Sequence, residues 1–234
     1  MNNKAVELSQ KLLFAIKQSE EPYKYIIDLA EYPMADLKQE LSNDAITKAF
    51  WINIYNAFST YLLHPNPKII LTQAGRIKHF NDKTIIIAGQ PLSLNEIEHG
   101  ILRKSKVWWS KGYLSKLWVK GFEKEFRVRE FDNRIHFALN CGGESCPPIR
   151  FYSPEQIEEQ LQMATLSFLE GETSYDKSTD TVTTSPILKW YIGDFNGSMG
   201  IIKLLKMYEV IPQDISPKLE YKDYSWEAKV RFMT

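Results

Sequence analysis

The stretch from Ser42 to His64, SNDAITKAFWINIYNAFSTYLLH, constrains the fold more than any other part of the chain. Its apolar residues fall on nearly every side of a helix, and a helix that is apolar all round is usually buried in the middle of a protein. Ser42 or Asn43 can cap its start, Asp44 suits the positive end of the helix dipole, and Pro65 follows its end. The sequence therefore predicts a central helix around which the other elements pack.

Two asparagines, Asn53 and Asn56, stand inside this apolar helix. Because they are three residues apart, they lie on one face of it. Asparagine is a poor helix former, and burying its amide without hydrogen-bond partners is costly. This leaves two hypotheses: the amides bond neighbouring loops and fix the packing, or they line a cleft and orient a catalytic group.

Hydrophobic periodicity predicts mostly helices along the rest of the chain, with a few strands. A strand over 83–88, a polar hairpin over 173–185 and a docked aromatic tail containing Tyr224 and Trp226 complete the prediction. No repeat or linker divides residues 1–234, so we expect a single α+β domain, mostly helical with a small β-sheet, and the helical segment 1–44 packed on the rest. The predicted helices cover residues 5–19, 42–64, 93–106, 153–170, 186–195 and 198–211, and several short helices are predicted within 22–41.

The composition narrows the class of protein. The chain has 234 residues with 29 basic and 29 acidic side chains, and this balance argues against nucleic acid as a partner. Aromatic residues alternate with lysines over 107–122, which could stack on bases, although an amphipathic helix and loop explain the pattern as well and are favoured. With no run of 18 apolar residues we expect no membrane span.

The beginning of the chain shows no signal peptide, because it lacks an uninterrupted apolar region and a cleavage site of small residues. The expected location is therefore cytoplasmic for the sequence as written, and periplasmic or secreted if a signal peptide was removed. The sequence does not indicate an oligomeric state.

A polar group lies further along the chain, within LSLNEIEHGILR, residues 92–103. Ser93 and Glu96 form a predicted capping box at the start of a helix. Glu96 and His99 have the spacing of one half of a di-metal carboxylate site, but the other half is missing from the sequence. Glu98 and Arg103 are the other polar residues of interest, with a solvated helix face as the alternative. Gly100 is costly inside a helix, and it could allow another backbone to approach closely.

Both cysteines lie in IHFALNCGGESCPPIR, residues 135–150. Two extended runs are predicted around the turn at 132–133, and the second carries His136 on the side opposite its bulky apolar residues, although residues 136–140 could also be helical. A glycine pair after Cys141 permits a sharp turn with positive φ, and a proline pair after Cys146 stiffens the next part of the backbone.

These segments together resemble domain-of-unknown-function family 547. The resemblance is carried, over roughly residues 45–226, by AFWINIYNAF, LSLNEIEHGILR, RIHFALNCGGESCPPIRFYSPEQIEEQL, PILKWYIGDF and YKDYSW. The family has no established activity, and its members often carry a secretion signal or added domains. His99 occupies a position where the family varies. The resemblance gives weight to the positions of Asn53, Tyr55, Asn56, Glu98, His136, Cys141, Cys146 and Pro147.

The chemistry of these residues first suggests a cysteine-dependent enzyme. Cys146 would be the nucleophile, His136 the base and Glu98 or Asn53 the group that orients it, for acyl transfer or hydrolysis. Asn56, Cys141 and Arg103 would line the binding site in a polar cleft. The ligand would be an unidentified small molecule or peptide, with no cofactor.

Three other hypotheses remain open. The segment could be structural in a non-catalytic module that binds a protein or ligand, because free cysteine is often a small buried hydrophobe. A metal site could use His136, Cys141 and Cys146, with His99 or Glu98 as the fourth ligand, but the paired spacing of zinc clips is missing, so we expect no metal. The two cysteines could also form a disulfide that closes a small loop.

Overall fold

Helix α4 (Asp44–Leu63) lies at the centre of the N-terminal part of the molecule, as the sequence predicts. The Asn43 side chain caps it by accepting a hydrogen bond from the amide of Ile46. Helix α1 (Lys4–Gln18) packs along α4, and a short π-helix and α7 (Ile157–Glu172) contact it elsewhere. Because α4 is covered on several sides, its bulky apolar side chains, such as Phe50 and Trp51, are fully buried.

This computed structural model describes residues 3–232. Helices account for 53% and strands for 10%, which confirms the predicted mostly helical α+β domain. The remaining α-helices are α2 (Tyr23–Ala30), α3 (Met34–Glu40), α5 (Gln73–Asn81), α6 (Gly121–Phe126), α8 (Pro186–Trp190) and α9 (Gly197–Met207). The 3₁₀ helices are η1 (Pro67–Leu71), η3 (Trp108–Ser110), η4 (Asn133–Phe137) and η5 (Ile192–Phe195), and the π-helix is η2 (Glu96–Leu102).

The strands form two small sheets rather than one. Strands β1 (Ile85–Ile87) and β2 (Gln90–Leu92) make an antiparallel hairpin, and its two turn residues, Ala88 and Gly89, both have positive φ, as tight hairpins require. The predicted polar hairpin is β3 (Ser174–Asp176) with β4 (Thr181–Thr184), and β5 (Lys218–Tyr221) joins β4 in parallel.

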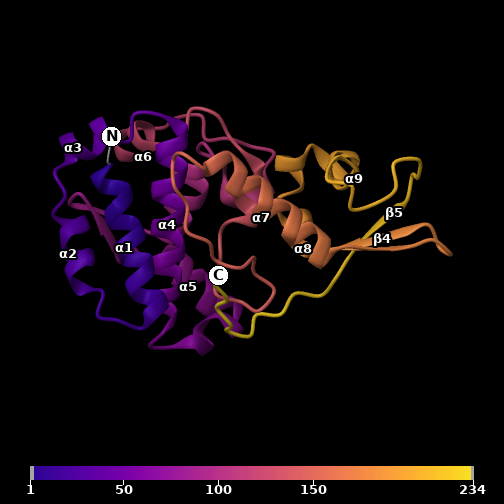
Figure 1. Cartoon of the computed structure of the whole chain (residues 1–234), viewed down its shortest axis with the longest axis horizontal. Helices are drawn as coiled ribbons and strands as arrows, with labels where there is room; N and C mark the ends of the chain where they lie inside the picture. Colours follow the sequence, from indigo (N-terminus) through magenta and orange to yellow (C-terminus); the bar gives the residue numbers. More distant parts are fainter. Residues whose placement is uncertain (1–2, 233–234) are drawn as a thin grey trace.

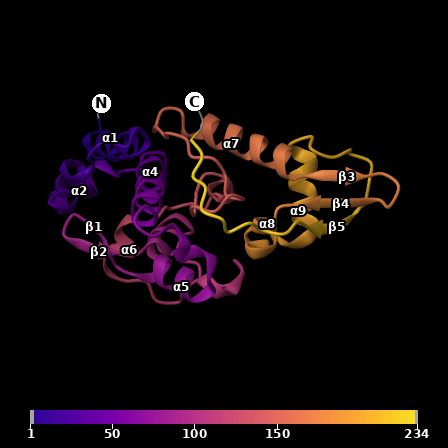
Figure 2. The ribbon, with the colours of Figure 1, turned by 90° about the horizontal axis from the view of Figure 1, so that it is seen from below.

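The molecule is elongated, with α1–α4 at one end and α9 with the strands β3–β5 at the other (Figure 1). One hydrophobic core surrounds α4 and a second lies against α9, where it includes Phe137. The tail after β5 runs back beneath α7 toward the first core, as Figure 2 shows. Bridges pair Gly143 with Ala228 and Ile149 with Phe232. The predicted docking of the tail is therefore confirmed.

Two local predictions are wrong. Residues 134–140 are not extended, because Asp132 caps the 3₁₀ helix η4 by accepting a hydrogen bond from the amide of Arg134. The helical alternative for this stretch was the better one. Residues 107–122 form a short 3₁₀ turn and the predicted loop, which leads into α6, but no amphipathic helix, and several of their aromatic side chains are exposed.

No helix within residues 3–232 is both long and apolar enough to cross a bilayer.

Candidate functional site

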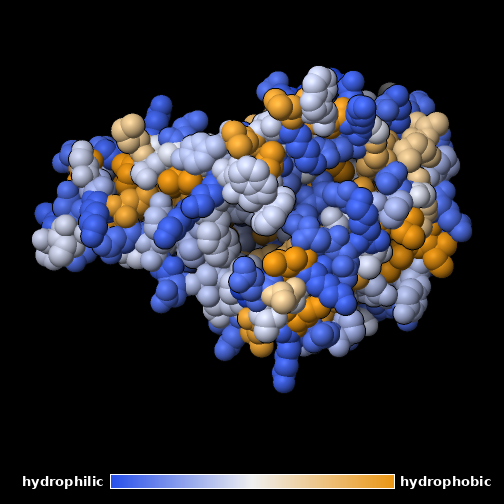
Figure 3. Space-filling view, turned by 180° about the vertical axis from the view of Figure 1, so that it is seen from behind, coloured by the Kyte–Doolittle hydropathy of each residue, from blue (hydrophilic) through white to orange (hydrophobic). Residues whose placement is uncertain are grey.

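A cavity of about 490 Å³ lies where α4, α5, η2, the cysteine segment and the C-terminal tail meet. Seen from behind, the surface is hollowed near the middle of the molecule, and hydrophobic side chains are exposed beside the hollow (Figure 3). The cavity joins segments far apart in the sequence, as ligand sites often do. Its aromatic lining residues are Tyr55, Phe80, Trp108, Trp190, Tyr191, Tyr224 and Trp226, and its ionisable ones include Arg76, Glu98, His99 and His136.

Glu98 enters this cavity from the π-helix η2. The predicted capping box is present at its start, where Ser93 and Glu96 exchange hydrogen bonds. The turns then widen to the π spacing, with the Arg103 amide bonded to the carbonyl of Glu98. Gly100 makes room for the side chain of Glu123, not for a second backbone. Because π-helices frequently occur at functional sites, this segment is a candidate on geometry alone.

The carboxylate of Glu98 is held by two tyrosine hydroxyls. Tyr191 donates to Oε1 at 2.6 Å, and Tyr55 donates to Oε2 at 3.2 Å. Burial by itself raises the pKa of Glu98, but the charges of His99 and Arg103 and the hydrogen bond from Tyr191 lower it below its ordinary value. Burial and the neighbouring carboxylate raise the pKa of both tyrosines, so each stays a donor. Each carboxylate oxygen retains an acceptor position for a ligand.

Behind Glu98, a buried ion pair links η2 to η5. The Nε and Nη2 atoms of Arg103 lie 2.8 and 2.7 Å from Asp194 Oδ2, and both side chains have no exposed surface. His136 Nε2 is 2.8 Å from the same oxygen. Burial raises the pKa of Asp194, but the bond from His136 and the nearby positive charges lower it below its usual range. Because the carboxylate can only accept, Nε2 of His136 carries the proton.

Tyr191 links the Glu98 carboxylate to the ion pair of Arg103 and Asp194 behind it. Its ring stacks on the His136 ring with centroids 3.9 Å apart, and the Arg103 guanidinium lies 4.6 Å from its centroid. Burial lowers the pKa of His136, although Asp194 opposes this shift. His136 is therefore a neutral donor held in a fixed tautomer at neutral pH, with Asp194 as its orienting partner.

His99 completes the cluster. Nη1 of Arg103 donates to Nδ1 of His99 at 2.7 Å, and since a guanidinium has only donors, the imidazole proton must sit on Nε2. Burial lowers the pKa of His99 to about 4, with the Arg103 charge acting in the same direction. A second proton on Nδ1 would point at the guanidinium, so acid should disrupt this arrangement.

We expect the free energy of unfolding to fall as the pH is lowered from about 6.5 to about 4. In this window the unfolded chain binds a proton at His99 that the folded chain does not, so the stability present above pH 6.5 is lost toward pH 4. His99 alone should account for on the order of 3 kcal/mol, and His136 shifts in the same direction. Urea unfolding at several pH values measures this slope.

The histidine variants separate this effect from general acid sensitivity. His99→Gln should flatten the slope, whereas His64→Gln, at an exposed histidine, should leave it unchanged. Equal unfolding free energies of the wild type at pH 7 and pH 4.5 would contradict the prediction.

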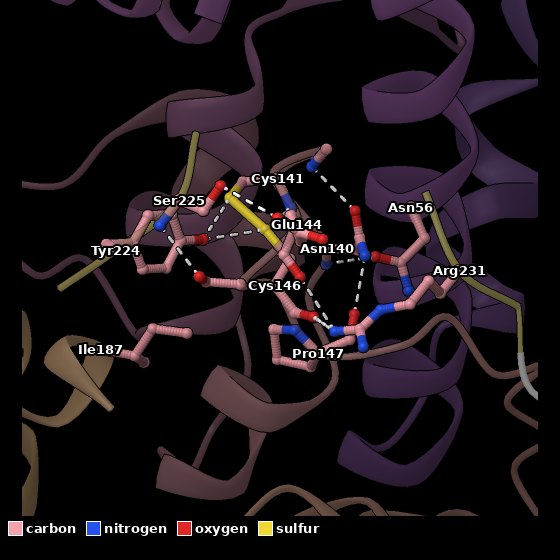
Figure 4. Close-up of a disulfide and its surroundings, with 12 residues drawn as sticks. Asn56, Asn140, Cys141, Glu144, Cys146, Pro147, Ile187, Tyr224, Ser225 and Arg231 are labelled. Atoms are coloured by element: carbon pink, nitrogen blue, oxygen red, sulfur yellow. Dashed lines mark hydrogen bonds between the residues drawn. A yellow bond between two sulfur atoms is a disulfide. The ribbon is translucent and has the colours of Figure 1, made fainter. Parts of the chain in front are cut away.

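The two cysteines form a disulfide, with Cα atoms 6.2 Å apart. Gly142 turns between them with a φ of 90°, and a side chain there would overlap Leu63. The Tyr224 hydroxyl lies 3.1 Å from Sγ of Cys141 and 3.0 Å from Sγ of Cys146, so the tail covers the bond (Figure 4). Cys146 therefore presents no thiolate in this state, although both cysteines line the cavity.

Asn53 and Asn56 bond backbone groups. Asn53 accepts from the Tyr152 amide at 3.0 Å and donates to the Tyr152 carbonyl at 2.9 Å. Asn56 accepts from the amide of Asn140 at 2.8 Å and donates to the carbonyl of Ala138 at 2.9 Å. This is the packing arrangement anticipated for the pair, and among the described residues neither asparagine lines the cavity.

The structure thus brings together only part of the predicted site. Of the predicted catalytic residues, Glu98, His136 and Cys146 line one cavity with the predicted binding residue Cys141, whereas Arg103 lies behind it. Sequence reasoning missed Asp194 and Tyr191. One signal was available, because Asp194 is the single acidic residue in 181–208 and the single charged residue in WYIGDF, residues 190–195.

The residues considered for metal binding separate. Glu96 bonds Lys83 at 2.6 Å, while His99 is buried against Arg103. Within residues 3–232, no group of three or more histidine, cysteine, aspartate or glutamate side chains could hold a metal ion.

Comparison with known proteins gives a match to a protein family. Residues 39–169, more than half of the chain, match the family described as "Protein of unknown function, DUF547". No curated protein and no solved structure matches significantly. The matched range contains both cysteines and His136 but ends before Tyr191 and Asp194.

Proposed function

The chain belongs to the DUF547 family, and because that membership assigns no activity, we propose from the chemistry of the cavity that the protein binds a small organic amine. The observation that carries the proposal is an ionised Glu98 opening into a cavity walled by aromatic rings. An ammonium group would meet the carboxylate, and the apolar part of the ligand would lie against the rings.

The charge balance of the buried cluster supports a cationic group. Glu98 and Asp194 are ionised, Arg103 supplies one positive charge, and His99 and His136 are neutral at pH 7, because burial lowers the pKa of both. The cluster therefore carries one excess negative charge beneath the cavity. Burial strengthens its attraction for a cation, because screening by water is weak there.

The aromatic lining supports an organic rather than an inorganic cation. The Trp190 and Trp226 rings stack with centroids 5.7 Å apart, and Tyr224 lies 4.6 Å from Trp190. Arg76 also lines the cavity, but its guanidinium already has partners. It lies 4.5 Å from the centroid of the Trp226 ring and donates a hydrogen bond to the Ile70 carbonyl. The faces of aromatic rings attract cations and apolar groups alike, whereas a small metal ion would need several oxygen ligands.

Titration calorimetry with phenethylamine and with phenethyl alcohol tests this proposal at pH 7. The amine should bind more tightly than the alcohol, and Glu98→Gln should weaken amine binding by roughly ten- to a hundredfold, the usual range for losing a charged hydrogen bond. Glu96→Gln is the matched control, because Glu96 lies on the same π-helix but bonds Lys83 outside the cavity. Equal binding of both probes, or an unaffected Glu98→Gln variant, would contradict the proposal.

A second candidate function belongs to the reduced protein. It is favoured by the presence of Cys146 and His136 in the lining of one cavity. Once a reductant has opened the disulfide, Cys146 could attack an acyl carbon while His136 accepts the thiol proton, with Asp194 rather than Asn53 orienting the imidazole. The leaving group would depart with that proton, and water would later release the acyl group.

Alkylation by iodoacetamide, with and without dithiothreitol, tests this second candidate. Cys146 should become reactive only after reduction, and His136→Ala should raise the pH at which it reacts. A thiol that stays unreactive in dithiothreitol, or an apparent pKa that His136→Ala leaves unchanged, would remove the support for this function.

A further inference from the structure

The segment of residues 104–120, here called the tryptophan–lysine loop, exposes an unusual number of large apolar side chains. It contains three of the six tryptophans of the chain and five lysines, but no aspartate or glutamate. The exposed fractions of its large apolar side chains lie between 51% and 91%. These side chains are Trp108, Trp109, Tyr113, Leu114, Leu117 and Trp118. A cluster of this kind on a water-soluble surface usually marks a site of interaction.

The loop is held in a defined shape. The Val107 amide bonds the carbonyl of Leu114, and the Lys116 amide bonds the carbonyl of Ser105. Its turn is anchored on the body of the protein, since the Gly193 amide bonds the carbonyl of Lys111 at 2.8 Å. The backbone therefore presents the apolar side chains in place, with little ordering left to do on binding.

We infer that the tryptophan–lysine loop docks the protein on the surface of a membrane that contains anionic lipids. Tryptophan favours the interface between water and hydrocarbon, and the leucines can enter the acyl boundary beneath it. Within residues 3–232, Lys111 and Lys120 have no ion-pair partner, and they add positive charge beside the exposed rings. An anionic lipid surface complements both properties.

Two other occupants fit less well. Single-stranded nucleic acid would stack on the aromatic rings, but Leu114 and Leu117 have no stacking face, and Leu117 is 91% exposed. A second copy of this chain would bring lysines against lysines in a symmetric contact, since the loop carries no acid to pair with them.

Co-sedimentation of the full chain with phosphatidylcholine vesicles, with and without phosphatidylserine, tests the inference. The affinity for vesicles should be roughly tenfold or more higher with phosphatidylserine, from the attraction of the lysines. Tryptophan fluorescence should shift to the blue on binding. High salt should weaken the binding, because it screens the lysine charges.

The double variant Leu117→Ser, Trp118→Ser should lose most of the vesicle binding. Both side chains are more than 80% exposed, so the fold should not depend on them. The control is Met199→Ser, at a residue that is 86% exposed but lies in α9 outside the loop. Trp108 is left unchanged because it also lines the cavity. Phenethylamine binding, measured on the same variants, tests the cavity independently of vesicle binding.

The inference fails if the wild type does not bind phosphatidylserine vesicles, or if the double variant binds them as well as the wild type. It also fails if the loop instead supports binding to a single-stranded oligonucleotide or a dimer in solution, without binding to vesicles.

Discussion

Replacing Asp194 by asparagine should lower the free energy of unfolding by about 3 to 5 kcal/mol, the usual cost of removing one partner from a buried ion pair. Asp194 Oδ2 accepts from both Arg103 and His136, and its side chain has no exposed surface. Asparagine keeps the shape but removes the carboxylate that bonds the buried Arg103 guanidinium directly, so that Glu98 is the opposite charge left in the cluster. Urea unfolding at pH 7 measures the loss.

A double variant shows whether the Arg103 charge, once it has lost its directly bonded carboxylate, causes this loss. Adding Arg103→Met to Asp194→Asn removes that charge, so the pair of changes should cost clearly less than the sum of the two single changes. Glu220→Gln is the surface control, because its partner Lys218 is 71% exposed, and its effect should stay within about 0.5 kcal/mol. Strict additivity, or a loss below about 1 kcal/mol for Asp194→Asn, would refute the explanation.

Replacing Asn56 by alanine should lower the free energy of unfolding by about 2 to 5 kcal/mol. The change leaves the Asn140 amide and the Ala138 carbonyl buried without partners, at about 1 to 3 kcal/mol each. Asn140 in turn bonds the Pro147 carbonyl and the Gly142 amide on the cysteine loop. Hydrogen exchange at the Asn140 amide should therefore become faster, and this can be measured even if the protein remains folded.

Ser59 provides a matched control for Asn56. It lies one turn away on α4 and is equally buried, but within residues 3–232 its hydroxyl has no hydrogen-bond partner. Ser59→Ala should therefore be neutral or slightly stabilising. If Asn56→Ala were as mild as Ser59→Ala, the amide would not be holding the cysteine segment to α4.

The elements that could be predicted from the sequence depend on residues close together in the chain. The cap of α4 at Asn43 and the capping box of Ser93 and Glu96 each join residues three positions apart. The apolar pattern of α4 predicts that the helix is buried. The extended assignment of 134–140 failed because alternation over a few residues competes with a local cap at Asp132, which favours a helical turn.

The candidate site was only half predictable. Glu98, His136 and Cys146 could be selected by residue type and setting, and they do line one cavity. Their partners could not be selected, because nothing in the sequence near His136 specifies Asp194, 58 residues away, and nothing near Glu98 specifies Tyr191, 93 residues away. Whether the cysteines pair also depends on how the loop between them turns.

By itself, then, the sequence determined the central helix, its asparagine pair, the polar hairpin and the stiff cysteine turn, because periodicity and capping act over a few residues. The tertiary structure alone decided which charges share the buried cluster and which rings wall the cavity. It did so because packing brings η5 against η2 and η4 and the tail against the cysteine loop, and in this low-dielectric setting a buried ionisable group without a partner is costly.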